Sequence, residues 1–194
     1  MKKYGILGGT FNPPHIAHSI VADTVREELE LDKIIFIPSG NPPLKESISA
    51  EHRLAMASLA FESNSNFEVS DIEIQNAKEK SYSVNTLQKL KKLYKKEESV
   101  LYFIIGVDNL LELHRWKEPD KLFELSEVIV INRPNYSVDI SKTKFADKVE
   151  FVNVPFLEIS SSMIRDYVSI GRSIKYLVCR KVEDYINNNN LYKM

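Results

Sequence analysis

The sequence predicts an α/β protein with an open, mostly parallel sheet, helices on both faces, and a helical C-terminal part at about residues 156–194. Short apolar runs alternate along the chain with segments of helical periodicity. The first two apolar runs are joined by a glycine loop and a helical segment, which is typical of a βαβ unit. From the length of 194 residues we expect a single domain over residues 1–194.

The first unit is the clearest part of this pattern. Residues 4–7 form an apolar run that stops at Gly8-Gly9, which favours a buried strand. Residues 15–29 carry apolar side chains at roughly helical spacing, and residues 33–37 form a second strand-like run that stops at Pro38. Strand, loop, helix and strand in this order indicate two parallel strands with a crossover between them.

The remaining elements continue the alternation. Glu118-Pro119-Asp120 is typical of a helix start, because proline suits the first helical position. Further strands are expected over residues 67–74, 100–105, 127–131 and 151–154, and further helices over residues 51–61, 84–94, 161–168 and 181–187.

The composition excludes several classes of protein. Lys and Arg total 26 against 27 for Asp and Glu, so the chain has no cationic surplus for nucleic acid. Cys179 is the single cysteine, which excludes an intrachain disulfide and a multi-cysteine metal site. No apolar stretch is long enough to span a bilayer, and the N-terminus has no signal-peptide pattern. We expect a soluble, cytoplasmic protein without a membrane segment.

The strongest chemical signal lies at residues 8–18. The glycines after the first strand allow a phosphate to approach the backbone, and the following helix N-terminus offers free N–H groups to an anion. His15 and His18 are three residues apart, so both rings are expected on one helix face beside that site. Two imidazoles there can donate hydrogen bonds to phosphate oxygens as charge develops. A zinc site is not indicated, because no suitable third ligand stands nearby.

A second phosphate signal lies near the C-terminus. Ser160, Ser161 and Ser162 directly precede an apolar-periodic run, so they cap a helix and leave hydroxyls for an anion. Arg165 in the first turn suits a bidentate contact with phosphate oxygens. Taken alone this pattern is weak, since serine caps are common.

Together the two segments resemble the (T/H)xGH and ISSTxIR motifs of the nucleotidyltransferase superfamily, whose fold is Rossmann-like. Between the two histidines of the first motif the superfamily has a glycine, and this chain has Ala17 at that position. The resemblance implies that His15, His18 and Arg165 are catalytic. It also implies that ATP is bound by the following residues: Gly8, Gly9, Thr10, Phe11, Gly106, Asp108, Ser161 and Ser162.

Four further segments resemble the nicotinate mononucleotide adenylyltransferases of bacteria. Residues 37–45 are similar to their IPxxxPPHK loop, 81–87 to SYTVDTL, 103–116 to FIIGADxL…W, and 176–186 to YLVPxxVxxYI. The resemblance implies that Lys45, Ser83 and Trp116 bind the mononucleotide, with the indole stacked on the pyridine ring. Leu44 replaces the histidine of the first of these loops.

The resemblance therefore implies an enzyme that joins ATP and nicotinate mononucleotide, with Mg²⁺ brought by ATP and no protein metal site. A homo-oligomer is compatible with the sequence but not indicated by it. The alternatives are a pantetheine-phosphate adenylyltransferase, whose chains lack the Trp116 segment, and a sensor of NAD-type nucleotides on the same scaffold. The presence of His15, His18 and Arg165 argues against a sensor without turnover.

Overall fold

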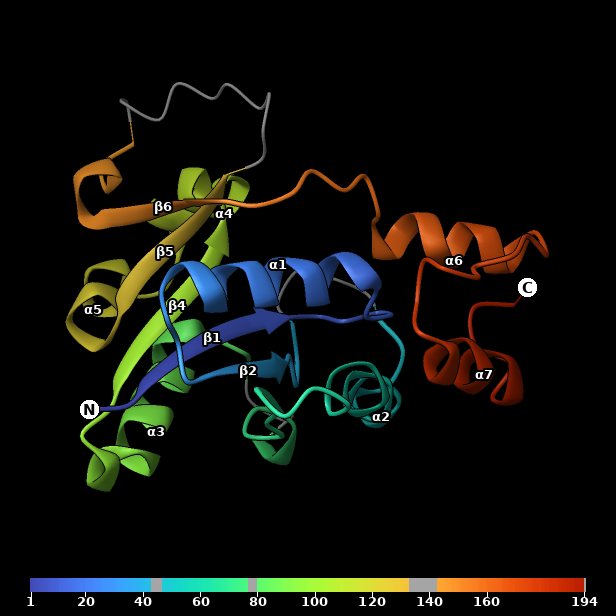
Figure 1. Cartoon of the computed structure of the whole chain (residues 1–194), viewed down its shortest axis with the longest axis horizontal. Coiled ribbons are helices and arrows are strands. Elements are labelled where there is room, and N and C mark those ends of the chain that lie inside the picture. Colours follow the sequence, from blue (N-terminus) through green and yellow to red (C-terminus); the bar gives the residue numbers. More distant parts are fainter. Residues whose placement is uncertain (43–46, 77–79, 133–142, 194) are drawn as a thin grey trace.

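The computed structural model describes residues 1–42, 47–76, 80–132 and 143–193, and within them six strands form one sheet (Figure 1). Every pairing in this sheet is parallel, and the strand order is β3-β2-β1-β4-β5-β6. The strands are β1 (Lys3–Gly9), β2 (Lys33–Pro38), β3 (Phe67–Val69), β4 (Val100–Gly106), β5 (Glu127–Asn132) and β6 (Val149–Asn153). The expected parallel α/β architecture is confirmed.

Seven α-helices lie within the described residues. They are α1 (Ile16–Glu28), α2 (Ala50–Phe61), α3 (Ser83–Leu93), α4 (Val107–Glu112), α5 (Pro119–Leu125), α6 (Ser161–Ser169) and α7 (Arg180–Asn188). None of the described helices is long and apolar enough to cross a membrane.

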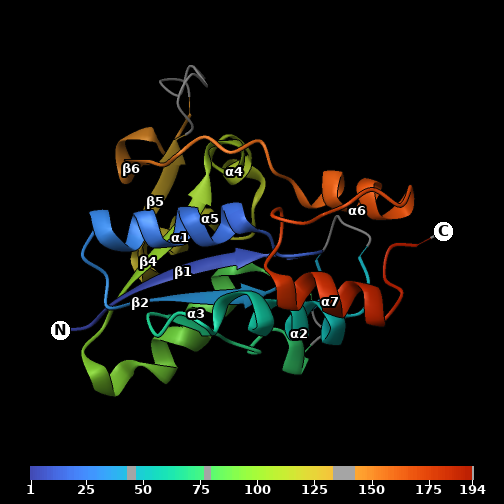
Figure 2. The same cartoon turned by 45° about the vertical axis from the view of Figure 1, so that its right-hand side comes forward.

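Successive residues of each strand face opposite sides of the sheet. Helices cover both sides, so both faces of the sheet are buried. Figure 2 shows α1 on one side and α3 on the other. On the α3 side, Ile35 and Ile105 pack with the helix residue Leu87. On the α1 side, Phe36 and Ile104 pack with side chains of α1 and α2. Near-continuous apolar strands of this kind are typical of parallel sheets.

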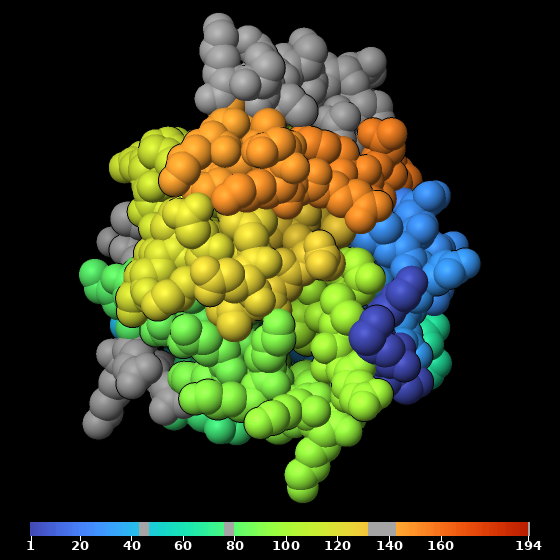
Figure 3. Space-filling model, turned by 90° about the vertical axis from the view of Figure 1, so that its left-hand side faces the viewer, coloured from blue at the N-terminus to red at the C-terminus, as the bar shows by residue number. Residues whose placement is uncertain are grey.

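A third apolar cluster attaches the C-terminal helices to the sheet domain. Met56 of α2 packs with Ile164 of α6 and with Val182 and Ile186 of α7. Both C-terminal helices lie beyond the ends of the strand arrows (Figure 1), so the N-terminus of α6 is brought to the carboxyl edge of the sheet. On the opposite face, where the strands begin, α5 in yellow lies between the β6 segment in orange and the end of α3 in green (Figure 3).

One predicted element is wrong in length. The strand expected over residues 67–74 ends at Val69, and Ile74–Asn76 form a 3-10 turn instead. The Asp71 carbonyl accepts the N–H groups of Ile74 and Gln75, and the Ser70 hydroxyl accepts that of Ile72. These local bonds compete with a sheet ladder, which is why serine and aspartate favour turns over strand interiors.

Candidate active site

Two cavities open at the carboxyl edge of the sheet, one on each side of the end of β1. Their volumes are about 650 and 570 Å³, and Gly9 and Thr10 line both. At this edge β2 lies on one side of β1 and β4 on the other, so the strand order reverses here. Open α/β sheets bind ligands at such a switch point, because the loops on its two sides diverge and leave a crevice.

The first cavity collects the two phosphate motifs, although about 150 residues separate them in sequence. His15 and His18 come from the start of α1, and Arg165 comes from the first turns of α6. Two helix N-termini and a guanidinium therefore face one space, an arrangement that favours an anion. The other lining residues are Leu7, Phe11, Asn12, Ala17, Val21, Ile131, Val154, Pro155, Leu157, Ile159, Ser160, Ser161 and Ser162.

Phe11 fixes the shape of the loop between β1 and α1. Its backbone is left-handed, with φ of 48°, and its ring is buried against Phe36, Phe61 and the edge of His18. A Cβ on Gly9 would come within 3.0–3.2 Å of this ring. Gly9 therefore allows the aromatic side chain to anchor the loop while the backbone stays open to both cavities.

The two histidines form a stacked pair at the start of α1. His15 is the N-cap residue, and its ring lies 3.7 Å from that of His18, between centroids, at an interplanar angle of 28°. The His15 backbone N–H donates to His18 Nδ1 at 3.1 Å. Since Nδ1 accepts, the proton of neutral His18 lies on Nε2. His15 Nδ1 is buried and has no hydrogen-bond partner in the described part of the chain.

Burial keeps both rings neutral near pH 7. It lowers the pKa of His15 from its usual 6.5 to about 4. Burial, and then the adjacent His15 ring, lower the pKa of His18 well below 6.5. A neutral imidazole still donates one N–H, so the pair can offer two donors to an anion without introducing a buried charge.

The N-terminus of α6 is tied directly to the loop after β1. The Ser160 hydroxyl caps the helix by accepting the Met163 N–H, and the Ser161 hydroxyl donates to the Pro13 carbonyl at 2.8 Å. Arg165 Nη1 donates to the Asn12 carbonyl at 2.9 Å, which uses one of its five N–H donors. The role of the Ser161 hydroxyl in phosphate binding stays a prediction, because in this structure the hydroxyl donates its hydrogen bond to the loop after β1.

Tyr192, near the C-terminus, completes this junction. Its hydroxyl donates to the Asn12 side-chain oxygen at 2.8 Å, so Asn12 is held through both its carbonyl and its side chain. Asn12 is itself buried and lines the first cavity. A residue near the C-terminus therefore holds in place a cavity wall that is formed by a residue near the N-terminus.

The second cavity lies on the α3 side of β1. Trp116 lines it and meets Phe103 edge-on at 6.4 Å, and Ser83 is the first residue of α3. Lys117 Nζ lies 5.0 Å from the centre of the Tyr82 ring and 3.5 Å from Asn85 Oδ1. An aromatic platform, a helix N-terminus and a cation thus converge on one space, which suits a planar, anionic ligand.

Not every expected site residue lies on a cavity. Gly8 borders the second cavity rather than the first, Gly106 and Asp108 line neither, and Lys45 lies outside the described residues. Gly106 caps α4, and Asp108 is exposed in the first turn of that helix. Their predicted contacts with ATP stay predictions.

Other residues of the site were not singled out from the sequence. Arg53, on α2, donates to the Thr10 carbonyl directly behind the wall shared by the cavities. Arg53 directly follows Glu51 and His52 in the sequence, so its local sequence does not distinguish it from a solvent-facing helix residue. The second cavity is also lined by Ser39, Pro42, Glu73, Ser81, Asn109, Glu112 and Arg115. No group of three or more His, Cys, Asp or Glu in the described chain is arranged to hold a metal ion.

The fold and the paired cavities define a doubly wound, nucleotide-binding α/β protein with room for two anionic ligands that meet at one turn. Comparison with known proteins then places it more closely. The model of the cytidylyltransferase-like family matches residues 6–167. The chain belongs to that family and, within it, to the nicotinate-nucleotide adenylyltransferases, as relatives matched over their full length show.

The most similar relatives include two that are each named "Probable nicotinate-nucleotide adenylyltransferase". The one from Oceanobacillus iheyensis is 39% identical over 99% of this chain and 97% of its own, and the one from Clostridium tetani is 38% identical over the whole of both. Among solved structures, nicotinic acid mononucleotide adenylyltransferase of Plasmodium falciparum complexed with NaAD has a TM-score of 0.81 and 24% identity, over 99% and 98% of the chains. That likeness confirms the fold.

The buried histidine pair predicts a pH-dependent stability. The unfolded chain protonates His15 as the pH falls below about 6.5, whereas the folded chain resists until about pH 4, so the free energy of unfolding decreases across this window. For His15 alone the expected loss is at most about 3 kcal/mol. Denaturant unfolding of His15→Gln between pH 4 and 7 should give a shallower dependence than wild type.

His114→Gln, at an exposed position, controls for the loss of a histidine. If His15→Gln kept the full wild-type pH dependence, burial of the His15 ring would not be the cause.

Proposed function

We propose that the chain catalyses adenylyl transfer from ATP to nicotinate mononucleotide, giving nicotinate adenine dinucleotide and pyrophosphate, a step of NAD biosynthesis. The observation that carries the proposal is the pair of cavities that share Gly9 and Thr10 as a common wall. The names of the relatives supply the substrates. Substrates bound in the two cavities would bring their phosphates to the same turn.

The first cavity suits ATP. Its polar end is formed by His15, His18 and Arg165, which can donate to phosphate oxygens, and the N-termini of α1 and α6 add positive potential. Its other end is apolar, with Val154 and Leu157 available to a nucleobase. Of the residues predicted for ATP, Gly9, Thr10 and Phe11 would then border the triphosphate, whereas Gly8 borders the second cavity.

The second cavity suits the mononucleotide. Trp116 offers an indole face for the pyridine ring, and Ser83 offers a hydroxyl and a helix N-terminal N–H to its carboxylate. Lys117 adds a positive charge at the same rim. Donors aimed at a carboxylate leave the NH₂ of an amide unpaired, which disfavours the nicotinamide form.

The reaction itself needs no enzyme nucleophile. A phosphate oxygen of the mononucleotide forms a bond to the α-phosphorus of ATP, while the bond from that phosphorus to the bridging oxygen breaks and pyrophosphate leaves. The attacking phosphate is already largely an anion at neutral pH, because its second pKa is about 6. The protein's task is to hold both anions in line and to stabilise the charge that develops.

Mg²⁺ most simply enters with ATP. None of the described residues that line the first cavity is a carboxylate, so the ligands of the ion would be phosphate oxygens and water. A cytoplasmic location and the oligomeric state stay predictions.

A sensor of NAD-type nucleotides on this scaffold is the alternative from another class, and a pantetheine-phosphate enzyme is the alternative within the superfamily. Pyrophosphate release separates all three. With ATP present, nicotinate mononucleotide should support rapid release, nicotinamide mononucleotide slower release, and phosphopantetheine none. Tight binding without pyrophosphate release would favour the sensor, and release with phosphopantetheine alone would favour the other enzyme.

The histidine pair should act on the transition state. Removing one donor to developing phosphate charge typically costs about 10²–10³ in kcat. His18→Ala should therefore lower kcat by this factor and change the KM for ATP far less, as measured by steady-state pyrophosphate release. His52→Ala removes a histidine that bonds Tyr185 and lines neither cavity, and it should keep wild-type kcat. Near-native kcat in His18→Ala would exclude this role.

A further inference from the structure

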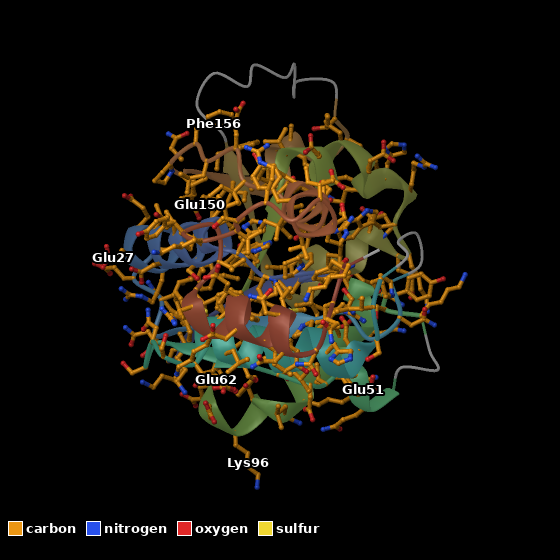
Figure 4. The ribbon with its side chains drawn as sticks, turned by 90° about the vertical axis from the view of Figure 1, so that its right-hand side faces the viewer. Glu27, Glu51, Glu62, Lys96, Glu150 and Phe156 are labelled. Carbon is orange, nitrogen blue, oxygen red and sulfur yellow. The ribbon has the colours of Figure 1, made fainter. Side chains whose placement is uncertain are left out.

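Arg53 is a charged side chain that the chemistry above does not use. It lies in α2, whose two ends are marked in Figure 4 by the outward-pointing Glu51 and Glu62. Unlike these two, Arg53 is only 1% exposed and is among the largest fully buried side chains of the described residues. Arginine is rarely buried so completely, because its charge loses hydration, so its contacts must compensate for that loss.

Those contacts are three backbone carbonyls, one in the turn at the end of β1 and two in the connection between β2 and α2. Nε donates to Ile48 at 3.2 Å, Nη1 to Thr10 at 3.0 Å and Nη2 to Gly40 at 3.2 Å. The planar guanidinium holds its donors at fixed directions, so it also fixes the three acceptors relative to one another. Carbonyls rather than carboxylates as partners indicate a role in loop geometry more than in charge pairing.

The chain around Thr10 and around Gly40 contributes to the walls of the two cavities. Thr10 lines both cavities, and Gly40 directly follows Ser39, which lines the second. The N–H and hydroxyl of Ser39 donate to the Gly9 carbonyl at 2.9 and 3.2 Å, so the loop after β2 lies directly on the turn after β1. Arg53 joins the same two segments from the α2 side, although it lines neither cavity itself.

We propose that Arg53 is a positioning residue for adenylyl transfer, which fixes the spacing between the turn after β1 and the loop after β2 and thereby the separation of the two substrates. The proposal rests on the proposed function for its kinetic consequence. Displacing reacting groups by about 1 Å can cost about 10²-fold in rate, even when the altered residue lies away from the chemistry. The groups that touch the substrates are unchanged by such a displacement, so binding of each substrate alone is affected much less.

Arg53→Lys is the sharpest variant. Lysine keeps the positive charge and most of the volume, but its single ammonium cannot present three donors in the guanidinium geometry. We expect kcat to fall by up to about 10²-fold while the KM values for ATP and for the mononucleotide change by much smaller factors. A residue with only a stabilising role would instead lower the unfolding midpoint and leave the kcat of the folded enzyme unchanged.

Met56→Ala is the matched control for lost stability. Met56 lies on the same helix and is fully buried in the C-terminal cluster, and it lines neither cavity. This variant should be destabilised and keep near-native kcat. Sub-denaturing guanidinium ion should raise the kcat of Arg53→Ala and not that of Met56→Ala, since only the first variant lacks a guanidinium between the loops.

Amide hydrogen exchange tests the positioning role without turnover. In Arg53→Lys, exchange should accelerate at residues 9–11 and 39–41 and stay slow in β4, whose core amides lie outside the affected loops. If the wild-type chain releases no pyrophosphate, the proposed function fails, while the exchange result still decides the role of Arg53. An Arg53→Lys enzyme with wild-type kcat, or with unchanged exchange in both loops, overturns the proposal.

Discussion

The site depends on one turn, at the end of β1, in which Gly9 and Thr10 separate two cavities. Two phosphates on either side of that turn repel each other, by about 4 kcal/mol for unit charges 4 Å apart at an effective dielectric constant of 20. The chain as a whole has a net charge of −1, so its overall field does not offset this repulsion. The offset must come from local donors, which are helix N-termini, neutral imidazoles and the guanidinium of Arg165.

Burial explains why these donors are of mixed kinds. Two imidazolium ions stacked at 3.7 Å would repel each other strongly, and the fold avoids this by lowering both pKa values. The two permanently charged guanidinium groups donate hydrogen bonds to backbone carbonyls, Arg165 to Asn12 and Arg53 to Thr10, and these bonds compensate for lost hydration. Positive charge and neutral donors thus surround the turn. Among the described residues, His15 Nδ1 is the one buried side-chain nitrogen or oxygen without a hydrogen-bond partner.

Much of this arrangement was predictable from the sequence. The alternation of apolar runs and helical segments gave the parallel sheet, and glycine, proline and serine marked the ends of its elements. His15 and Arg165 lie far apart in sequence, yet each was recognisable as part of a helix N-terminus suited to phosphate, and the fold brings them to one cavity. Trp116 and Ser83 likewise meet in the second cavity.

The remaining features have no local signature. Arg53 resembles a solvent-facing arginine in sequence, and its partners are backbone carbonyls of loops, which any residue type supplies. Tyr192 reaches Asn12 only because α7 returns the chain to the carboxyl edge of the sheet. Gly8 borders the second cavity and not the first, whereas Gly9, the last residue of β1, borders both.

The central claim is that the two substrates react directly across this turn, and the stereochemistry at the α-phosphorus tests it most directly. ATP made chiral by sulfur at that phosphorus is converted with the mononucleotide, and the configuration of the dinucleotide product is determined. A single in-line displacement inverts the centre, and inversion is the predicted result. Retention would require two displacements through an adenylyl-enzyme, which would make His15 or His18 a nucleophile and contradict direct transfer.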